Sequence, residues 1–112
     1  MKIVKDLSLS ELKEMMRNFF GDMVKGVIDI DRRLIAVDAQ LHVDLELIML
    51  EDGSKQNNLW GINFYPELFS SDDFIEFDSM INIRPSFGNS SRNIEDEKIK
   101  NEILAIVKEA IK

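Results

Sequence analysis

Two stretches of the chain alternate between apolar and polar residues with a period of two. In residues 59–65, Trp60, Ile62 and Phe64 fall on one side of an expected strand, and Asn63 and Tyr65 fall on the other. Residues 77–84 continue the same alternation. The pattern therefore predicts two strands, 59–65 and 77–84, that lie side by side with their apolar faces toward a core.

Both ends of the chain show a helical period instead. Ser8 and Glu11 have the spacing of a capping box, and apolar residues then recur at helical spacing until Gly21, a natural stop. Near the other end, Asp96 can cap a helix whose apolar side continues to Ala110. These patterns predict a first and a last helix, and residues 2–5 suit a short edge strand.

The middle of the chain is less uniform. Residues 24–38 predict a strand–turn–strand with one dry face and with the turn at residues 31–34. Residues 41–50 fit a strand by alternation and a helix by the spacing of Leu41, Leu45 and Met49. The apolar run from Leu47 to Leu50 breaks the alternation and favours the helix.

Together these elements predict an α+β fold, in which a mainly antiparallel sheet of about four to five strands packs against two or three helices. The chain has 112 residues, of which 45% are hydrophobic and 31% charged, as in ordinary soluble domains. That length suffices for one core without metal or disulfide support. We therefore expect a single domain over residues 1–112.

Charge and cysteine content narrow the function classes. The net charge of −7 repels phosphates, so we expect no nucleic-acid partner and no membrane partner. The chain has no cysteine, which removes thiolate chemistry and fits a reducing compartment. Its first residues lack the apolar core of a signal peptide, and the longest apolar run, Ile103–Val107, is too short to cross a bilayer. A cytoplasmic protein is the expectation.

The strongest candidate site follows from the two expected strands. Asp78, Asn82 and Arg84 would line up two residues apart, in reach of Asn63 and Tyr65 across the ladder. The guanidinium could clamp a carboxylate or phosphate while the amides and the phenol orient it. The alternative is a solvated sheet face, which antiparallel sheets commonly have.

A second candidate precedes the last helix, in the loop SFGNSSR at residues 86–92. Ser90 and Arg92 could help to hold an anion on backbone amides near a helix amino end. The acids at positions 95–97 oppose this, and a loop held by its own Ser and Asn hydrogen bonds is the alternative.

The sequence offers few residues that could bind a metal or a cofactor. His42 is the single histidine, which is too few for a multi-histidine site. A row of acids on the outer side of the 24–38 hairpin, together with Asp44, could attract Mg²⁺ or Ca²⁺, but the spacing is not that of an EF-hand. We expect solvated acids there, no metal site and no cofactor. The row comprises Asp29, Asp31 and Asp38.

Three sequence blocks resemble those of a small prokaryotic family of unknown function. They are LEDGSKQNNLWGINFYPE, FDSMINIRP and NSSRNIED, which together with their spacing extend over most of the chain. The resemblance implies a compact α+β fold of about this length and implies no reaction, ligand or catalytic residue. In that family a proline often follows the acid that matches Asp96. Glu97 stands there in this chain and equally suits a first helical turn.

Two function classes remain. We favour a non-catalytic binding or interaction module, with a small anionic molecule as the candidate ligand and a homodimer as the candidate assembly. The alternative is a small hydrolase or transferase that acts on a compact anionic substrate. The chain has no phosphate-binding loop and no GxSxG nucleophile elbow, which counts against that alternative.

Overall fold

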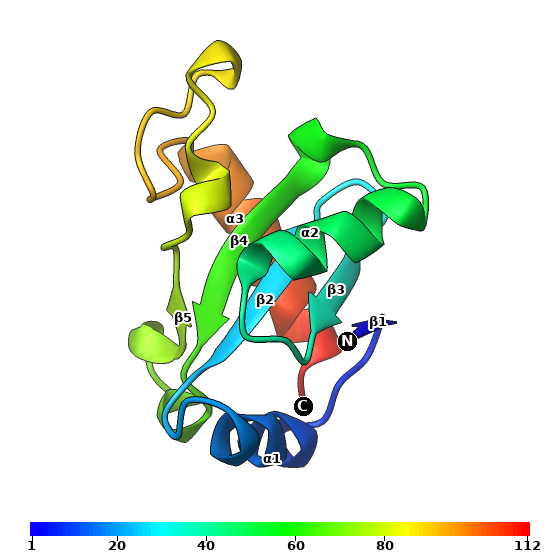
Figure 1. The fold of residues 1–112 in the computed structure, drawn as a ribbon. Helices are drawn as coiled ribbons and strands as arrows, with labels where there is room; N and C mark the ends of the chain where they lie inside the picture. Colours follow the sequence, from blue (N-terminus) through cyan, green and yellow to red (C-terminus); the bar gives the residue numbers. More distant parts are fainter.

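The computed structural model describes all residues 1–112, which form a five-stranded antiparallel sheet and three helices (Figure 1). The strands lie in the order β1-β3-β2-β4-β5, with β2 in the centre. The predicted α+β class and its mainly antiparallel sheet are confirmed. The elements are β1 (Lys2–Val4), α1 (Leu9–Asn18), β2 (Val24–Asp29), β3 (Leu34–Val37), α2 (His42–Glu51), β4 (Leu59–Phe64), β5 (Ile75–Glu76) and α3 (Glu97–Ala110).

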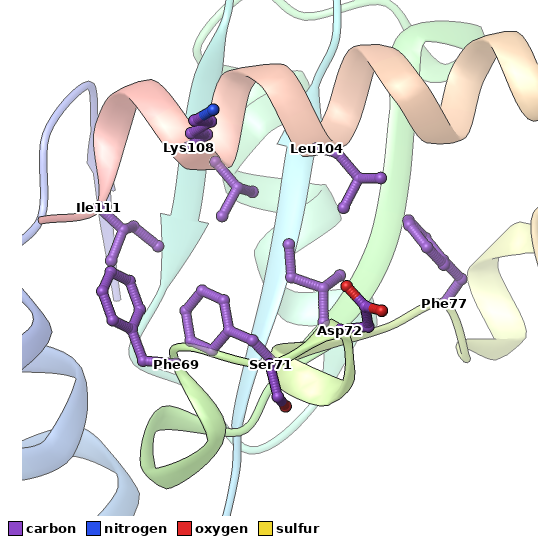
Figure 2. A pocket seen from close by; sticks show the side chains of 10 residues that line it. Phe69, Ser71, Asp72, Phe77, Leu104, Lys108 and Ile111 are labelled. Atoms are coloured by element: carbon purple, nitrogen blue, oxygen red, sulfur yellow. The ribbon is translucent and has the colours of Figure 1, made fainter.

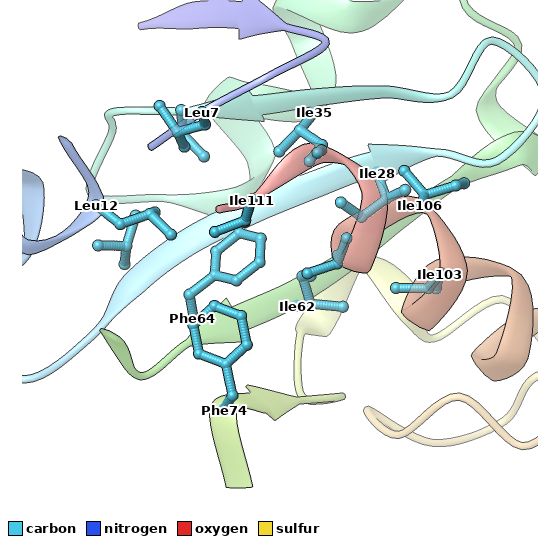
Figure 3. Packing of buried hydrophobic residues seen from close by; sticks show 14 of the residues in the cluster. Leu7, Leu12, Ile28, Ile35, Ile62, Phe64, Phe74, Ile103, Ile106 and Ile111 are labelled. Carbon is cyan, nitrogen blue, oxygen red and sulfur yellow. The ribbon is translucent and has the colours of Figure 1, made fainter. Parts of the chain in front are cut away.

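Helices cover both faces of the sheet, with α2 on one face and α3 on the other (Figure 1). The α3 face holds the larger core, a cluster of 18 buried residues to which α1 also contributes. In it Ile28 and Ile62 from the strands lie near Ile103 and Ile106 of α3, and Phe64 packs beside Phe74 (Figure 3). The shared apolar face predicted for β4 is confirmed.

A smaller core lies between the sheet and α2. It consists of five buried residues: Val27, Ala36, Leu45, Met49 and Leu59. The predicted hairpin of β2 and β3 is confirmed, but the expectation that it has only one dry face is wrong. Alternate strand residues point to opposite sides, and α2 buries the side that was expected to be wet.

Asp29 corrects the prediction of a solvated acidic row. Its carboxylate is fully buried and accepts hydrogen bonds from the backbone N–H groups of Asp31 and Arg32, both at 2.9 Å. Ser54 Oγ donates a third bond at 2.6 Å. Because these bonds fold the β2–β3 turn back onto the strand end, Asp29 shapes the hairpin.

Individual hydrogen bonds confirm the predicted caps of the first and the last helix. Ser8 Oγ accepts from the Glu11 N–H at 3.1 Å, and the Glu11 carboxylate accepts from the Ser8 N–H at 3.3 Å, so the capping box is present. Asp96 accepts from the Lys98 N–H at 2.8 Å and begins α3. The segment that fitted both patterns is a helix, α2, which starts after Leu41 without a side-chain cap.

The strand predicted for residues 77–84 is wrong. β5 ends at Glu76, and short 3-10 turns follow at Met80–Asn82 and Pro85–Phe87. The side chain of Asn82 replaces a backbone ladder here, because its Oδ1 accepts from the Gly61 N–H at 2.8 Å and its Nδ2 donates to the Gly61 carbonyl at 2.9 Å. The free edge of β4 is thereby satisfied without a neighbouring strand.

Gly61 permits this arrangement. A Cβ atom built at this position would lie 2.5 Å from Cβ of Ser79, far inside van der Waals contact. The glycine of the LWGIN block therefore serves the close approach of residues 79–82 to β4. None of the helices combines the length and the apolar character that a membrane crossing requires.

Candidate functional site

Four of the predicted ligand residues gather at the end of β4 that adjoins β5. Asn63 Nδ2 donates to Glu76 Oε1 at 2.9 Å and to the Asp78 carbonyl at 3.2 Å. Tyr65 Oη donates to the same Glu76 oxygen at 3.0 Å. Burial, together with this hydrogen bond, raises the pKa of Tyr65 to about 12, so the phenol stays protonated. Arg92 Nε donates to Asp78 Oδ1 at 2.6 Å and extends the cluster outward.

His42 lies buried at the start of α2. Its Nε2 is 2.8 Å from the carbonyl oxygen of Ile62, so this nitrogen carries the proton and donates. Burial lowers the pKa of His42 to about 4, although the bond to the carbonyl acts in the opposite direction. The imidazole is therefore neutral at pH 7 and ties α2 to β4.

Arg84 lies apart from this cluster, toward the other end of β4, and Asn82 lies between the two, bonded to Gly61 and to the Arg92 carbonyl. The Arg84 guanidinium donates to the backbone carbonyls of Gln56 and Leu59, and its Cζ lies 4.4 Å from the centre of the Trp60 ring. Burial lowers the pKa of Arg84, while the charge of Glu46 on α2 raises it. The expected meeting of Arg84 with Asn63 and Tyr65 does not occur, because residues 77–84 do not run along β4 as a strand.

The backbone amides at Ser90 already hold an anion, which is a carboxylate of the chain itself. Glu95 Oε2 accepts from the Ser90 and Ser91 N–H groups, at 2.8 and 2.9 Å, and from Ser91 Oγ at 2.9 Å. The Ser91 hydroxyl and these amides hold the pKa of Glu95 below its usual value. The observed contacts give every predicted residue a bonding partner within the chain, and their role in ligand binding stays a prediction.

The largest opening in the protein is an apolar groove of about 460 Å³ between α3 and residues 69–77. In Figure 2, Leu104 and Lys108 of α3 form one wall, Phe69 and Asp72 stand on the other, and Phe77 lies at one end. Seven of its ten lining residues are hydrophobic: Phe69, Phe74, Ile75, Phe77, Leu104, Val107 and Ile111.

Two charged residues, Lys108 of α3 and Asp72 on the opposite wall, line this groove. Lys108 and Asp72 take part in none of the ion pairs of the structure. Ser71, by contrast, is engaged, because its Oγ donates to the Leu68 carbonyl and accepts from the Asp73 N–H. The groove can therefore take an apolar body and orient one charged group on it.

Comparison with known proteins gives a family but no activity. A family model described as "Protein of unknown function (DUF5674)" matches residues 1–110. The chain belongs to this family. No curated protein and no solved structure matches the chain.

Sequence reasoning missed several residues that organise this DUF5674 chain. Asn89 is buried, and its Nδ2 donates to the carbonyls of Asn82, Ser91 and Asn93 while its Oδ1 accepts from the Glu95 N–H. The alternative of a loop held by its own Ser and Asn hydrogen bonds covers this position, but no signal in the sequence singles out Asn89. Glu76 could have been found, since it lies two residues before Asp78 on the same side of the alternation.

Proposed function

We propose that the protein is a non-catalytic binding module, and that the groove between α3 and residues 69–77 holds a compact, largely apolar ligand with one anionic group. The observation that carries the proposal is the groove itself. Its volume of about 460 Å³ falls within the range of small-molecule sites, roughly 300–1,000 Å³.

The apolar part of the ligand follows from the lining. Three phenylalanines face the groove, and two of them, Phe69 and Phe74, pack edge to face with ring centres 5.1 Å apart. Such rings offer flat apolar area that loses little conformational entropy when a ligand covers it. An aromatic or branched aliphatic body would gain most from this surface.

The anionic group follows from Lys108. Its ammonium has no carboxylate partner, so an acid on the ligand would gain a new ion pair without breaking one. Asp72 on the opposite wall repels the same acid and would turn it toward α3. The two charges together fix the direction of the ligand.

The groove is a better ligand site than the arginines predicted from the sequence. Both Nη atoms of Arg84 donate to backbone carbonyls, and Arg92 Nε donates to Asp78. An anion at either guanidinium would compete with these bonds, and the buried carbonyls at Arg84 would lose their donors. An anion at Lys108 would break no ion pair of this kind.

Two fluorescent probes test the proposal. 1-Anilinonaphthalene-8-sulfonate has an aromatic body with a sulfonate, and N-phenyl-1-naphthylamine is a close neutral counterpart. Both should bind the full-length protein. Lys108→Ala should weaken the sulfonate probe about tenfold and leave the neutral probe nearly unchanged, because only one of them meets the ammonium. Asp72→Asn should strengthen the sulfonate probe.

A matched pair of leucines shows where the probes bind. Leu104 in the groove and Leu47 on α2 are exposed to similar extents, 43% and 54%. Leu104→Asp should abolish binding of both probes, and Leu47→Asp should have no effect. Binding that survives Leu104→Asp would rule out the groove, whereas equal losses of both probes in Lys108→Ala would remove the anionic group from the proposal.

A further inference from the structure

Helix α2 carries apolar residues on its outward side as well as on its buried side. Leu45 and Met49 are fully buried against the sheet, yet Val43 and Leu47 are each 54% exposed. Leu50 follows at the spacing i, i+4, i+7 and completes the stripe, although it is half-buried and also packs against the smaller core. A helix that covers one face of a sheet normally has polar residues on its outer side, so an apolar stripe there is unusual.

The apolar surface continues beyond the helix. α2 packs against the turn Met80–Asn82, where Met80 is 68% exposed and Ile83 just after it is 40% exposed. In Figure 1 this turn lies beside the amino end of α2. Single exposed apolar residues are ordinary, but a contiguous set on neighbouring elements is typical of an interaction surface.

The exposed charged residues of α2 itself are all acidic. Asp44 and Glu51 are exposed on α2, two turns apart, and neither takes part in an ion pair. The helix His42–Glu51 contains no lysine and no arginine. A second copy of α2 packed on this stripe would bring these acids together, and an anionic lipid surface would be repelled by them.

We propose that this surface, formed by the stripe on α2 together with Met80 and Ile83, binds a basic amphipathic helix of another protein. The apolar side of that helix covers Val43 and Leu47, and its lysines or arginines pair with Asp44 and Glu51. This is the helix-on-surface mode in which residues at i, i+3, i+4 and i+7 anchor the partner. The inference is independent of the ligand proposed for the groove, which lies against α3 on the opposite face of the sheet.

Designed peptides of about 18 residues test this inference with the full-length protein, since shorter helices are marginal in water. The first has leucines along one side and lysines elsewhere. The second replaces the lysines by glutamates, and the third scrambles the first so that no apolar stripe remains. The first alone should bind in fluorescence anisotropy, and amide NMR shifts should map to α2 and residues 80–83.

Variants separate the apolar and the charged contributions. Leu47→Ser should weaken the lysine peptide about tenfold or more, whereas Leu104→Ser in the groove should not change its affinity. Asp44→Asn combined with Glu51→Gln should weaken it and flatten its salt dependence. Equal binding of the scrambled peptide would overturn the inference, as would dimerisation of the protein that Leu47→Ser abolishes, because the occupant would then be a second copy.

Discussion

On its β2 side, β4 pairs along its whole length, from Leu59 opposite Asp29 to Phe64 opposite Val24, whereas on its outer side β5 reaches only Asn63 and Phe64. The rest of the outer side is completed by side chains: Asn82 bonds Gly61, and Arg84 bonds the Leu59 carbonyl. A backbone ladder tolerates many side chains, because its hydrogen bonds are made by the main-chain N–H and C=O groups that nearly every residue has. The outer side depends instead on individual residues, and the substitutions below test that contrast.

The largest effect is expected for Asn82→Leu. The two side chains are similar in size, but leucine leaves the buried N–H and C=O groups of Gly61 without their partner. The Arg92 carbonyl also loses the bond that Asn82 Nδ2 donates to it. An unsatisfied buried polar group costs about 1–3 kcal/mol, so we expect a loss of about 3 kcal/mol in the free energy of unfolding. Urea denaturation measures it.

Ile62→Val provides the comparison on the β2 side. Ile62 is fully buried and pairs with Gly26, but its side chain supplies no bond to the ladder. The expected loss is only about 1 kcal/mol, from one methylene group. Equal losses for Asn82→Leu and Ile62→Val would show that Asn82 acts as filler and that the outer edge of β4 needs no specific donor.

The effect expected for Gly61→Ala is smaller than that of Asn82→Leu. The new Cβ would lie 2.5 Å from Cβ of Ser79 and would push residues 79–82 away from β4. Overpacking of this kind costs about 2 kcal/mol. Ser79→Gly removes the two closest atoms, Cβ and Oγ at 2.5 Å, and leaves Ile81 Cγ1 at 3.1 Å. In the Ser79→Gly background, Gly61→Ala should therefore cost much less than it does in the wild-type protein. Simple additivity of the two losses would show that the contact is not the cause.

Much of the fold could be predicted because its signals are local or periodic. The capping box of α1, the cap of α3 and the apolar face of β4 each depend on residues close in sequence. The prediction for residues 77–84 was wrong because their polar residues alternate as in a strand with one solvent-exposed face. Two of those polar residues, Asn82 and Arg84, are in fact buried and bond to β4, and alternation alone cannot distinguish a ladder from side chains that imitate one.

The groove could not have been found from the sequence. Phe74 is buried in the core, and Phe69 and Phe77 line the groove beside it. Their place opposite Leu104 depends on how residues 66–77 turn back against α3, which is a contact across a sequence separation of about thirty residues for which no local pattern exists. Composition predicts how much apolar surface a chain has, and only packing decides where some of it is left open.

The smallest effect concerns the bond from α2 to β4, which His42 makes to the Ile62 carbonyl. The pKa of His42 is about 4 in the folded protein, against 6.5 for an unperturbed histidine, so the unfolded chain binds a proton at a pH where the folded protein does not. Stability is therefore complete above about pH 6.5 and falls as the pH decreases toward 4. Between pH 8 and pH 6 the loss should be about 1 kcal/mol.

His42→Gln offers an amide donor to the same carbonyl and cannot titrate, so its unfolding free energy should change less over this range. Urea denaturation at both pH values measures the unfolding free energies. If both proteins lost the same free energy between pH 8 and pH 6, His42 would not be the group responsible for the pH dependence.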